Sequence, residues 1–196
     1  MPPSPTPSST WTDADWELLW APYPEGTYRD VLKFIQPEDV VLEIGAGDVR
    51  LAILLAQKAR HVYALEIHQI LVEKAIPNPV ALPNNLTILN QDARTSPFPR
   101  GITVAVLLMR HCIHFRLYAD KLRAIGCQKL ITNARWRIGI EVIELHAPRQ
   151  TFEQIPLGWY ACWCGSTGFI PGPVEKLDEE TTSLVHEVSN CPNCSL

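Results

Sequence analysis

The sequence predicts an α/β fold in which a mostly parallel sheet is followed by a small cysteine-rich module. Apolar, strand-like segments alternate with helix-like segments between residues 39 and 133. A glycine-containing turn follows the first of these strands, and two cysteine pairs lie beyond residue 159. Strands that are apolar throughout are typical of a parallel sheet covered by helices on both faces.

Composition places the chain among ordinary globular proteins. Its 196 residues are 46% hydrophobic and 19% charged, which is enough for one substantial core and a small appendage. The net charge of −4 does not indicate a protein that coats nucleic acid, although a local basic patch is left open. There is no apolar run of about 18 residues and no signal-peptide pattern. We therefore expect a cytoplasmic protein without a membrane segment, whose six cysteines are thiols or metal ligands.

The elements follow from periodicity and punctuation. Pro and Ser in residues 1–10 predict a disordered leader, and a Trp-bearing helix is expected within 11–20. A helix over 27–35 is ended by Pro37. Strands are then expected at 39–44, 61–65, 86–89, 101–108 and 129–133, and helices at 49–58, 70–75 and 117–125. Segments 141–145 and 152–162 predict a final hairpin of this sheet, so that the larger domain spans 11–158 and the module 159–196.

The segment from Val40 to Asp48 is the most informative motif. It reads as a strand that enters a turn, in which Gly45 and Gly47 allow a tight bend and a close approach of ligand to backbone. A dinucleotide site would place a third glycine where Arg50 stands, so an NAD-linked oxidoreductase is the weakest alternative.

This stretch resembles motif I of the class I S-adenosylmethionine-dependent methyltransferases, whose pattern is acid-x-Gly-x-Gly, with Glu43 as the acid. The resemblance covers roughly residues 25–160, and it extends to Glu66 after the second strand and Asp92 after the third. It implies a Rossmann-like sheet of seven strands, the last antiparallel. It also implies that S-adenosylmethionine is bound by Glu43, Gly45, Gly47, Glu66 and Asp92. Glu66 would accept hydrogen bonds from the ribose hydroxyls, and Asp92 would accept one from the adenine amino group.

The acceptor is not readable from the loop after the fourth strand. Methyltransferases that act on amino groups of bases often carry Asn/Asp-Pro-Pro-Tyr there, and this chain does not. Arg110, His111 and His114 are the candidate catalytic residues, because a histidine can take a proton near neutral pH. Residues 133–136 are expected to line the acceptor pocket, and the loop 23–27 to cover the donor.

Four cysteines predict a zinc site. Cys162, Cys164, Cys191 and Cys194 form two close pairs that let four thiolates reach one ion, as in a zinc ribbon of structural role. A redox dithiol and four unengaged thiols remain alternatives. The residues between the pairs are acidic, which disfavours contact with phosphate and favours a protein partner or packing against the last strands.

Together these observations predict a methyltransferase that uses S-adenosylmethionine on an unidentified acceptor. One alternative is a module of the same fold that binds S-adenosylmethionine or a protein without catalysis. A second alternative is an RNA methyltransferase that uses the zinc ribbon for recognition.

Overall fold

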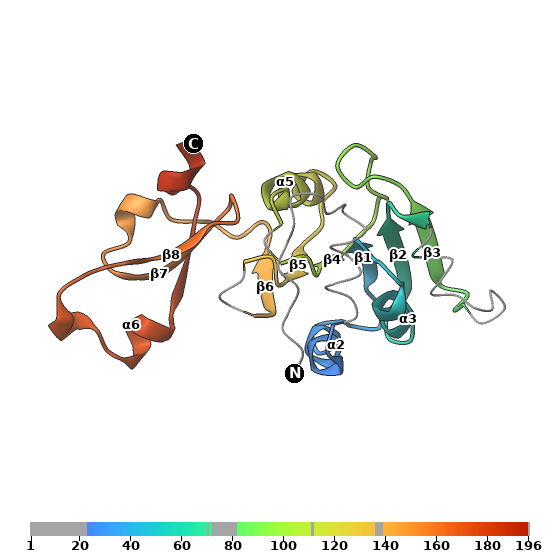
Figure 1. The fold of residues 1–196 in the computed structure, drawn as a ribbon, viewed down its shortest axis with the longest axis horizontal. Helices are drawn as coiled ribbons and strands as arrows, with labels where there is room; N and C mark the ends of the chain where they lie inside the picture. Colours follow the sequence, from blue (N-terminus) through green and yellow to red (C-terminus); the bar gives the residue numbers. More distant parts are fainter. Residues whose placement is uncertain (1–22, 70, 72–81, 111, 136–138, 196) are drawn as a thin grey trace, which may run out of the picture.

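Two sheets organise the chain. A computed structural model describes residues 23–69, 71, 82–110, 112–135 and 139–195. A six-stranded sheet occupies one body and a three-stranded sheet the other, and the second body lies beyond the sixth strand of the first (Figure 1). The predicted leader, the helix expected within 11–20, all but residue 71 of the helix expected at 70–75, and His111 lie outside the described residues.

The larger sheet has the order β3-β2-β1-β4-β5-β6. Its strands are β1 (Val40–Ile44), β2 (His61–Glu66), β3 (Leu86–Asn90), β4 (Val104–Leu107), β5 (Lys129–Thr132) and β6 (Glu141–Glu144). All neighbouring strands are parallel except β5 and β6. The mostly parallel Rossmann-like sheet is confirmed, with six strands rather than seven among the described residues. The strand order reverses between β1 and β4, where α/β sheets commonly bind ligands.

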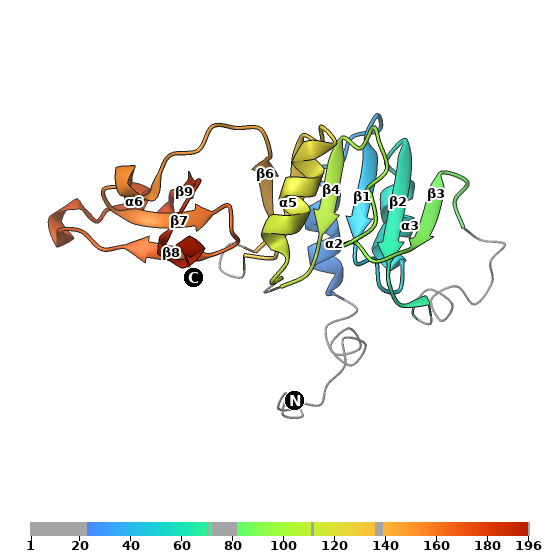
Figure 2. The ribbon, with the colours of Figure 1, turned by 90° about the horizontal axis from the view of Figure 1, so that it is seen from above.

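Helices cover both faces of this sheet (Figure 2). On one face, α2 (Glu25–Leu32) and α3 (Arg50–Ala56) pack against alternate residues of β1, β2 and β4. On the other face, α5 (Phe115–Ala124) packs against the remaining residues of β1, β4 and β5. Because successive strand residues point to opposite faces, a strand covered on both sides must be apolar throughout, which explains the uniform strands in the sequence.

The smaller sheet has the order β8-β7-β9. It contains β7 (Gly158–Cys162), β8 (Thr167–Ile170) and β9 (Val185–Val188), with the short helix α6 (Glu179–Ser183) before β9. β7 is antiparallel to β8 and parallel to β9. The parallel pair brings the last cysteines of the chain close to those at the end of β7.

The predicted final hairpin of the large sheet was wrong. Residues Phe152–Gln154 form a 3-10 helix, and β7 joins the small sheet instead of pairing with β6. Pro148 and Pro156 interrupt the chain between β6 and β7, and proline has no N–H to donate to a sheet. The return of the chain to the large sheet is therefore blocked where the hairpin was expected.

Buried polar contacts join the two bodies. Arg135, 1% exposed, forms ion pairs with Glu141 of β6 and Glu187 of β9. Burial alone disfavours its charge, yet the two carboxylates raise the pKa of the guanidinium. The expectation that Arg135 lines an acceptor pocket was wrong, because its donors are already engaged with these two acids.

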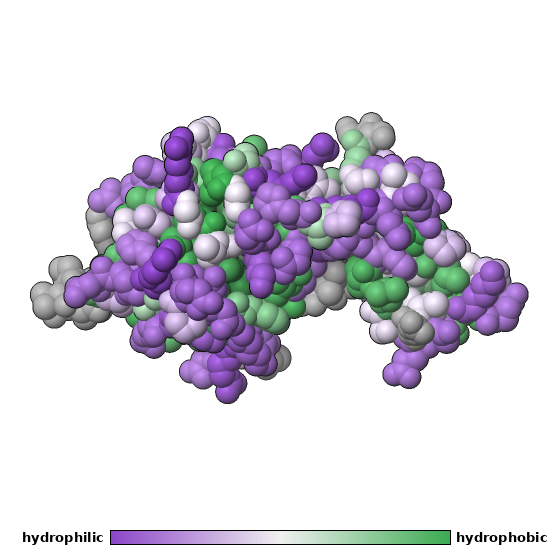
Figure 3. All heavy atoms as spheres, turned by 180° about the vertical axis from the view of Figure 1, so that it is seen from behind, coloured by the Kyte–Doolittle hydropathy of each residue, from purple (hydrophilic) through white to green (hydrophobic). Residues whose placement is uncertain are grey.

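The surface is mainly polar on the face drawn in Figure 3, with hydrophobic side chains showing between hydrophilic ones. This mixture is ordinary for a folded chain. Among the described residues, the helices are too short or too polar to cross a lipid bilayer.

Candidate active site and cysteine cluster

The turn after β1 has an unusual backbone. Gly45, Gly47 and Val49 adopt positive φ angles of 73°, 51° and 51°. A side chain on Gly45 would place its Cβ 3.0 Å from Met109 Cε, so the turn packs directly against the segment after β4. Val49 is fully buried, and its left-handed backbone costs about 1–2 kcal/mol. Strain held in this way is typical of binding sites, and sequence reasoning missed Val49.

Glu66 ends β2 and holds the glycine turn in place. Its carboxylate accepts one hydrogen bond from the backbone N–H of Gly47 and another from that of His68, each 2.8 Å long. Its side chain is nearly inaccessible to solvent. Each carboxylate oxygen has a second lone pair, so Glu66 retains the capacity to accept further protons.

Glu43 is a buried acid without a matching base. Its side chain lies within the sheet, only 5% exposed, and its Oε2 has no hydrogen-bond partner among the described residues. Burial raises the pKa of this carboxyl well above its usual range, and repulsion from Asp48 and Glu66 adds to the shift. Unpartnered buried polar atoms are rare and costly, so this carboxyl is suited to receive a cationic ligand group.

Asp92 lies at the same sheet edge, after β3, and is paired. Arg94 donates to Asp92 through Nε at 3.0 Å and through Nη2 at 2.8 Å. These hydrogen bonds hold the pKa of the Asp92 carboxyl below its usual range. Asn90 ties the end of β3 to that of β2 by donating from Nδ2 to the carbonyl of Glu66 over 3.0 Å.

Two of the three candidate catalytic residues after β4, Arg110 and His114, are among the described residues. Arg110 is exposed, and His114 precedes α5 with its ring edge-on to Tyr118 at 6.1 Å. Tyr23, from the segment before α2, donates its hydroxyl to the carbonyl of Leu108 over 2.9 Å. The N-terminal segment thus reaches the end of β4, although the helix already begins at Glu25 within the expected loop.

Asn133 follows β5 at this edge and is 3% exposed. Neither atom of its amide has a hydrogen-bond partner among the described residues. Within the predicted acceptor-lining segment, Asn133 therefore keeps free polar atoms while Arg135 does not. Trp136 lies outside the described residues.

The four cysteines predicted to bind zinc form one cluster. Their sulfurs all lie within 4.8 Å of one another. Sγ–Sγ distances are 3.4 Å for Cys162–Cys194, 3.6 Å for Cys164–Cys191 and 3.8 Å for Cys191–Cys194. Four thiolates around zinc at about 2.3 Å stand about 3.8 Å apart in a tetrahedron, so the cluster has the size that this ion requires.

A sequence profile of the family "Ribosomal RNA adenine dimethylase" matches residues 31–135, just over half of the chain. The chain belongs to this family of class I S-adenosylmethionine-dependent methyltransferases. The matched region contains β1 to β5 with their helices, and it ends before β6 and the cysteine cluster. No curated protein sequence matches the chain.

Solved structures similar to this chain include two transferases and a decarboxylase. A dimethyladenosine transferase from Plasmodium falciparum is 22% identical with a TM-score of 0.49, over 56% of this chain and 41% of that one. The tRNA (m1A58) methyltransferase TrmI from Aquifex aeolicus is 25% identical with a TM-score of 0.48, over 57% and 46%. Precorrin 8W decarboxylase from Methanobacterium thermoautotrophicum is 19% identical with a TM-score of 0.49, over 57% and 63%. The chain thus spans less than two thirds of each of these proteins.

Proposed function

We propose that this dimethylase-family chain binds S-adenosylmethionine at the carboxyl ends of β1, β2 and β3 and transfers its methyl group to a base in RNA. The observation that carries the donor assignment is the contact between Glu66 and the backbone of Gly47, beside the unpartnered carboxyl of Glu43. Glu66, which only accepts hydrogen bonds, and Glu43, which is suited to pair with a cation, thus both lie next to the glycine turn.

Each acid has a distinct task in this proposal. Glu66 accepts the ribose hydroxyl protons with the lone pairs that the backbone leaves free. Glu43 pairs with the donor's ammonium group, which gives its buried charge a partner. Asp92 binds the adenine amino group while sharing its carboxylate with Arg94. The glycine turn lets the donor lie against the backbone without a side chain in between.

Methyl transfer asks little more than alignment of these residues and acceptance of one proton. Bound S-adenosylmethionine supplies an electrophilic methyl group, and its sulfur leaves as a neutral thioether, so no acid is needed. His111 and His114 are the proposed proton acceptors in the segment after β4. Tyr23 holds that segment through the carbonyl of Leu108, which would help to keep it aligned for transfer.

The family supports an RNA base as acceptor. The net charge of −4 and the absent Asn/Asp-Pro-Pro-Tyr tetrapeptide weigh against it, so the acceptor needs its own test. Exposed Arg110 supplies local positive charge for phosphate contact, and exposed Arg116 adds to it while sharing its charge with Asp120 at 3.7 Å.

We further propose that the cysteine cluster holds zinc in a structural role. The spacing of the four sulfurs supports a closed tetrahedral shell, in which no position is open for water or substrate.

Titration calorimetry with S-adenosylmethionine tests the donor site. Wild type is expected to bind in the micromolar range, about −8 kcal/mol, and Glu66→Ala at least about tenfold more weakly. Glu38→Ala, which removes an exposed acid before β1, serves as the control and is expected to bind as wild type. Absence of binding by the wild type, to either the donor or its demethylated product, would sink the proposal.

Transfer of a tritiated methyl group then tests the acceptor. Incorporation into an unmodified ribosomal RNA transcript supports the RNA assignment. Incorporation into protein alone would replace the RNA assignment with a protein acceptor. Donor binding without transfer to any acceptor would indicate a module that binds S-adenosylmethionine without catalysis.

A further inference from the structure

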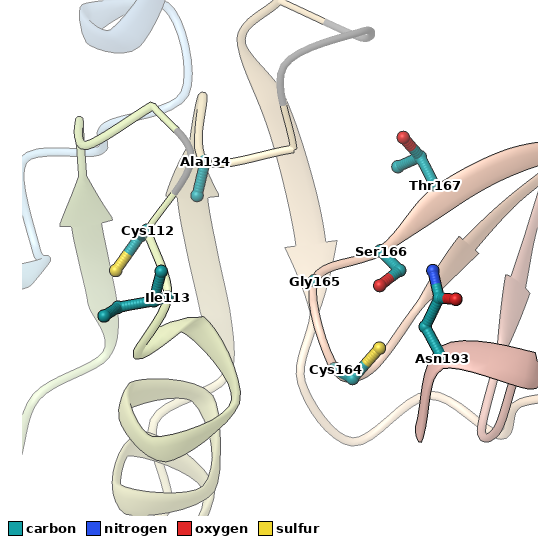
Figure 4. Close-up of a pocket in the computed structure, with 8 residues that line it drawn as sticks. All are labelled: Cys112, Ile113, Ala134, Cys164, Gly165, Ser166, Thr167 and Asn193. Atoms are coloured by element: carbon teal, nitrogen blue, oxygen red, sulfur yellow. The ribbon is translucent and has the colours of Figure 1, made fainter. Parts of the chain in front are cut away.

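A cleft of about 360 Å³ lies between the carboxyl edge of the large sheet and the cysteine cluster. Cys112 and Ile113, from the segment after β4, and Ala134, after β5, form one wall. The other wall comes from the segment that follows β7 and from the last turn of the chain: Cys164, Gly165, Ser166, Thr167 and Asn193. Figure 4 shows these two groups of residues on opposite sides of the gap, with the side chains of Cys112 and Ile113 turned away from the module in this view.

The second wall is fixed to the first by Trp163. This residue separates two clustered cysteines, and its ring is 8% exposed within the core that contains α5. Its Nε1 donates to Asp120 Oδ1 over 2.7 Å. Gly165 follows with φ +97°, and a Cβ there would lie 3.2 Å from Phe115. Only a glycine lets the chain approach α5 so closely, so the wall is held at a set distance.

The module side of the lining carries hydroxyl and amide groups. Ser166 and Thr167 carry hydroxyls and Asn193 an amide, which together donate and accept hydrogen bonds. Ile113, 89% exposed, adds an apolar surface on the opposite wall. An uncharged flat group with hydrogen-bonding edges fits the hydroxyls and the amide of this lining.

We propose that this cleft receives the acceptor base, so that the cysteine module forms half of the acceptor site and selects the base through Ser166, Thr167 and Asn193. The inference rests on the proposed function, because it needs an RNA base as acceptor. The family match ends at residue 135, before the second wall. Base preference is thus a property of this chain's own module rather than of the shared domain.

Substitution of Thr167 tests the cleft. Thr167→Trp fills it from the module side, and Thr167→Val removes one hydroxyl at nearly constant volume. Val174→Trp adds the same ring at a 79% exposed position of the module and serves as the matched control. Each variant is assayed for transfer of tritiated methyl groups to the ribosomal RNA transcript, for donor binding by calorimetry and for metal content.

We expect Thr167→Trp to lower kcat/KM for the transcript at least about tenfold, and Thr167→Val about threefold. Donor affinity and metal content should stay at wild-type values, as should all properties of Val174→Trp. Wild-type kcat/KM in both Thr167 variants would overturn the inference while leaving the proposed function intact. A wild type that methylates no RNA would overturn the proposed function, and the inference with it.

Discussion

Trp163 donates its indole N–H to the carboxylate of Asp120 over 2.7 Å, and through this bond the cysteine cluster is joined to α5. Arg149 stacks over the same ring at 4.0 Å. Trp163 stands between Cys162 and Cys164, so the ring packed in the core of the larger body and two ligands of the proposed zinc site belong to three consecutive residues.

Removal of the Trp163 ring should destabilise the whole chain. We expect Trp163→Ala to lower the free energy of unfolding by about 3–5 kcal/mol, and Trp163→Phe by about 1 kcal/mol through the lost hydrogen bond. Chemical denaturation measures both values. Leu184→Ala, at a half-exposed position of the module, should cost less than about 0.5 kcal/mol. Equal losses for Trp163→Ala and Leu184→Ala would contradict the docking described here.

Metal removal should act through the same ring. Protein purified without added zinc is expected to carry about one equivalent, and Cys194→Ser far less. Chelation should lower Tm and increase the exposure of Trp163 to a fluorescence quencher. Cys112→Ser, which changes a thiol outside the cluster, should retain the metal. Metal content below half an equivalent in the wild type would speak against zinc.

The ion pairs of Arg135 should behave differently from those at the surface. Arg135→Met leaves Glu141 without its cation, while Glu187 keeps only Arg149 at 3.6 Å, and we expect a loss of about 3–5 kcal/mol in the free energy of unfolding. Lys129→Met removes the partner of Glu144 in an exposed pair of 3.9 Å that also joins β5 to β6, and should cost less than about 1 kcal/mol. Similar losses for the two variants would show that the buried pair has no special weight.

The buried carboxyl of Glu43 should lower the stability of the fold at alkaline pH while strengthening donor binding. Its pKa is raised in the folded chain, so its favourable contribution to stability is complete only below its unfolded pKa and is lost as pH rises through the folded value. Glu43→Gln should therefore raise the free energy of unfolding at about pH 8. The difference in this free energy from wild type should vanish at about pH 4.

The same substitution should weaken donor binding about tenfold, because the buried partner of the ammonium group is lost. Glu38→Gln provides the control in both measurements. A variant that is more stable at alkaline pH but binds the donor as tightly as wild type would remove Glu43 from the donor site.

The positions of the first five strands along the chain and the glycine turn were predicted from the sequence because these depend on neighbouring residues. The apolar runs of β1 and β4 and the pair Gly45–Gly47 are local signals. The left-handed Val49 could not be predicted in this way, because its strain is offset by burial against residues from other elements. Arg135 meets Glu187 from 52 residues away, so its removal from the acceptor pocket was visible only in three dimensions. The hairpin was wrong because segment 152–162 was assigned to the large sheet, whereas Pro148 and Pro156 interrupt the path back to β6.

The parallel pairing of β7 with β9 also constrains how the chain folds. Ala161 pairs with Glu187, so the intervening segment must form a closed loop before the central strand of the small sheet has both neighbours. The ordering of such a loop is opposed by chain entropy, and its contacts are distant in sequence. The pairing of β1 with β4 in the large sheet closes a longer loop still, since Leu42 pairs with Ala105. Because Trp163 docks on α5, which belongs to the larger body, we expect the module to close only after that body has formed.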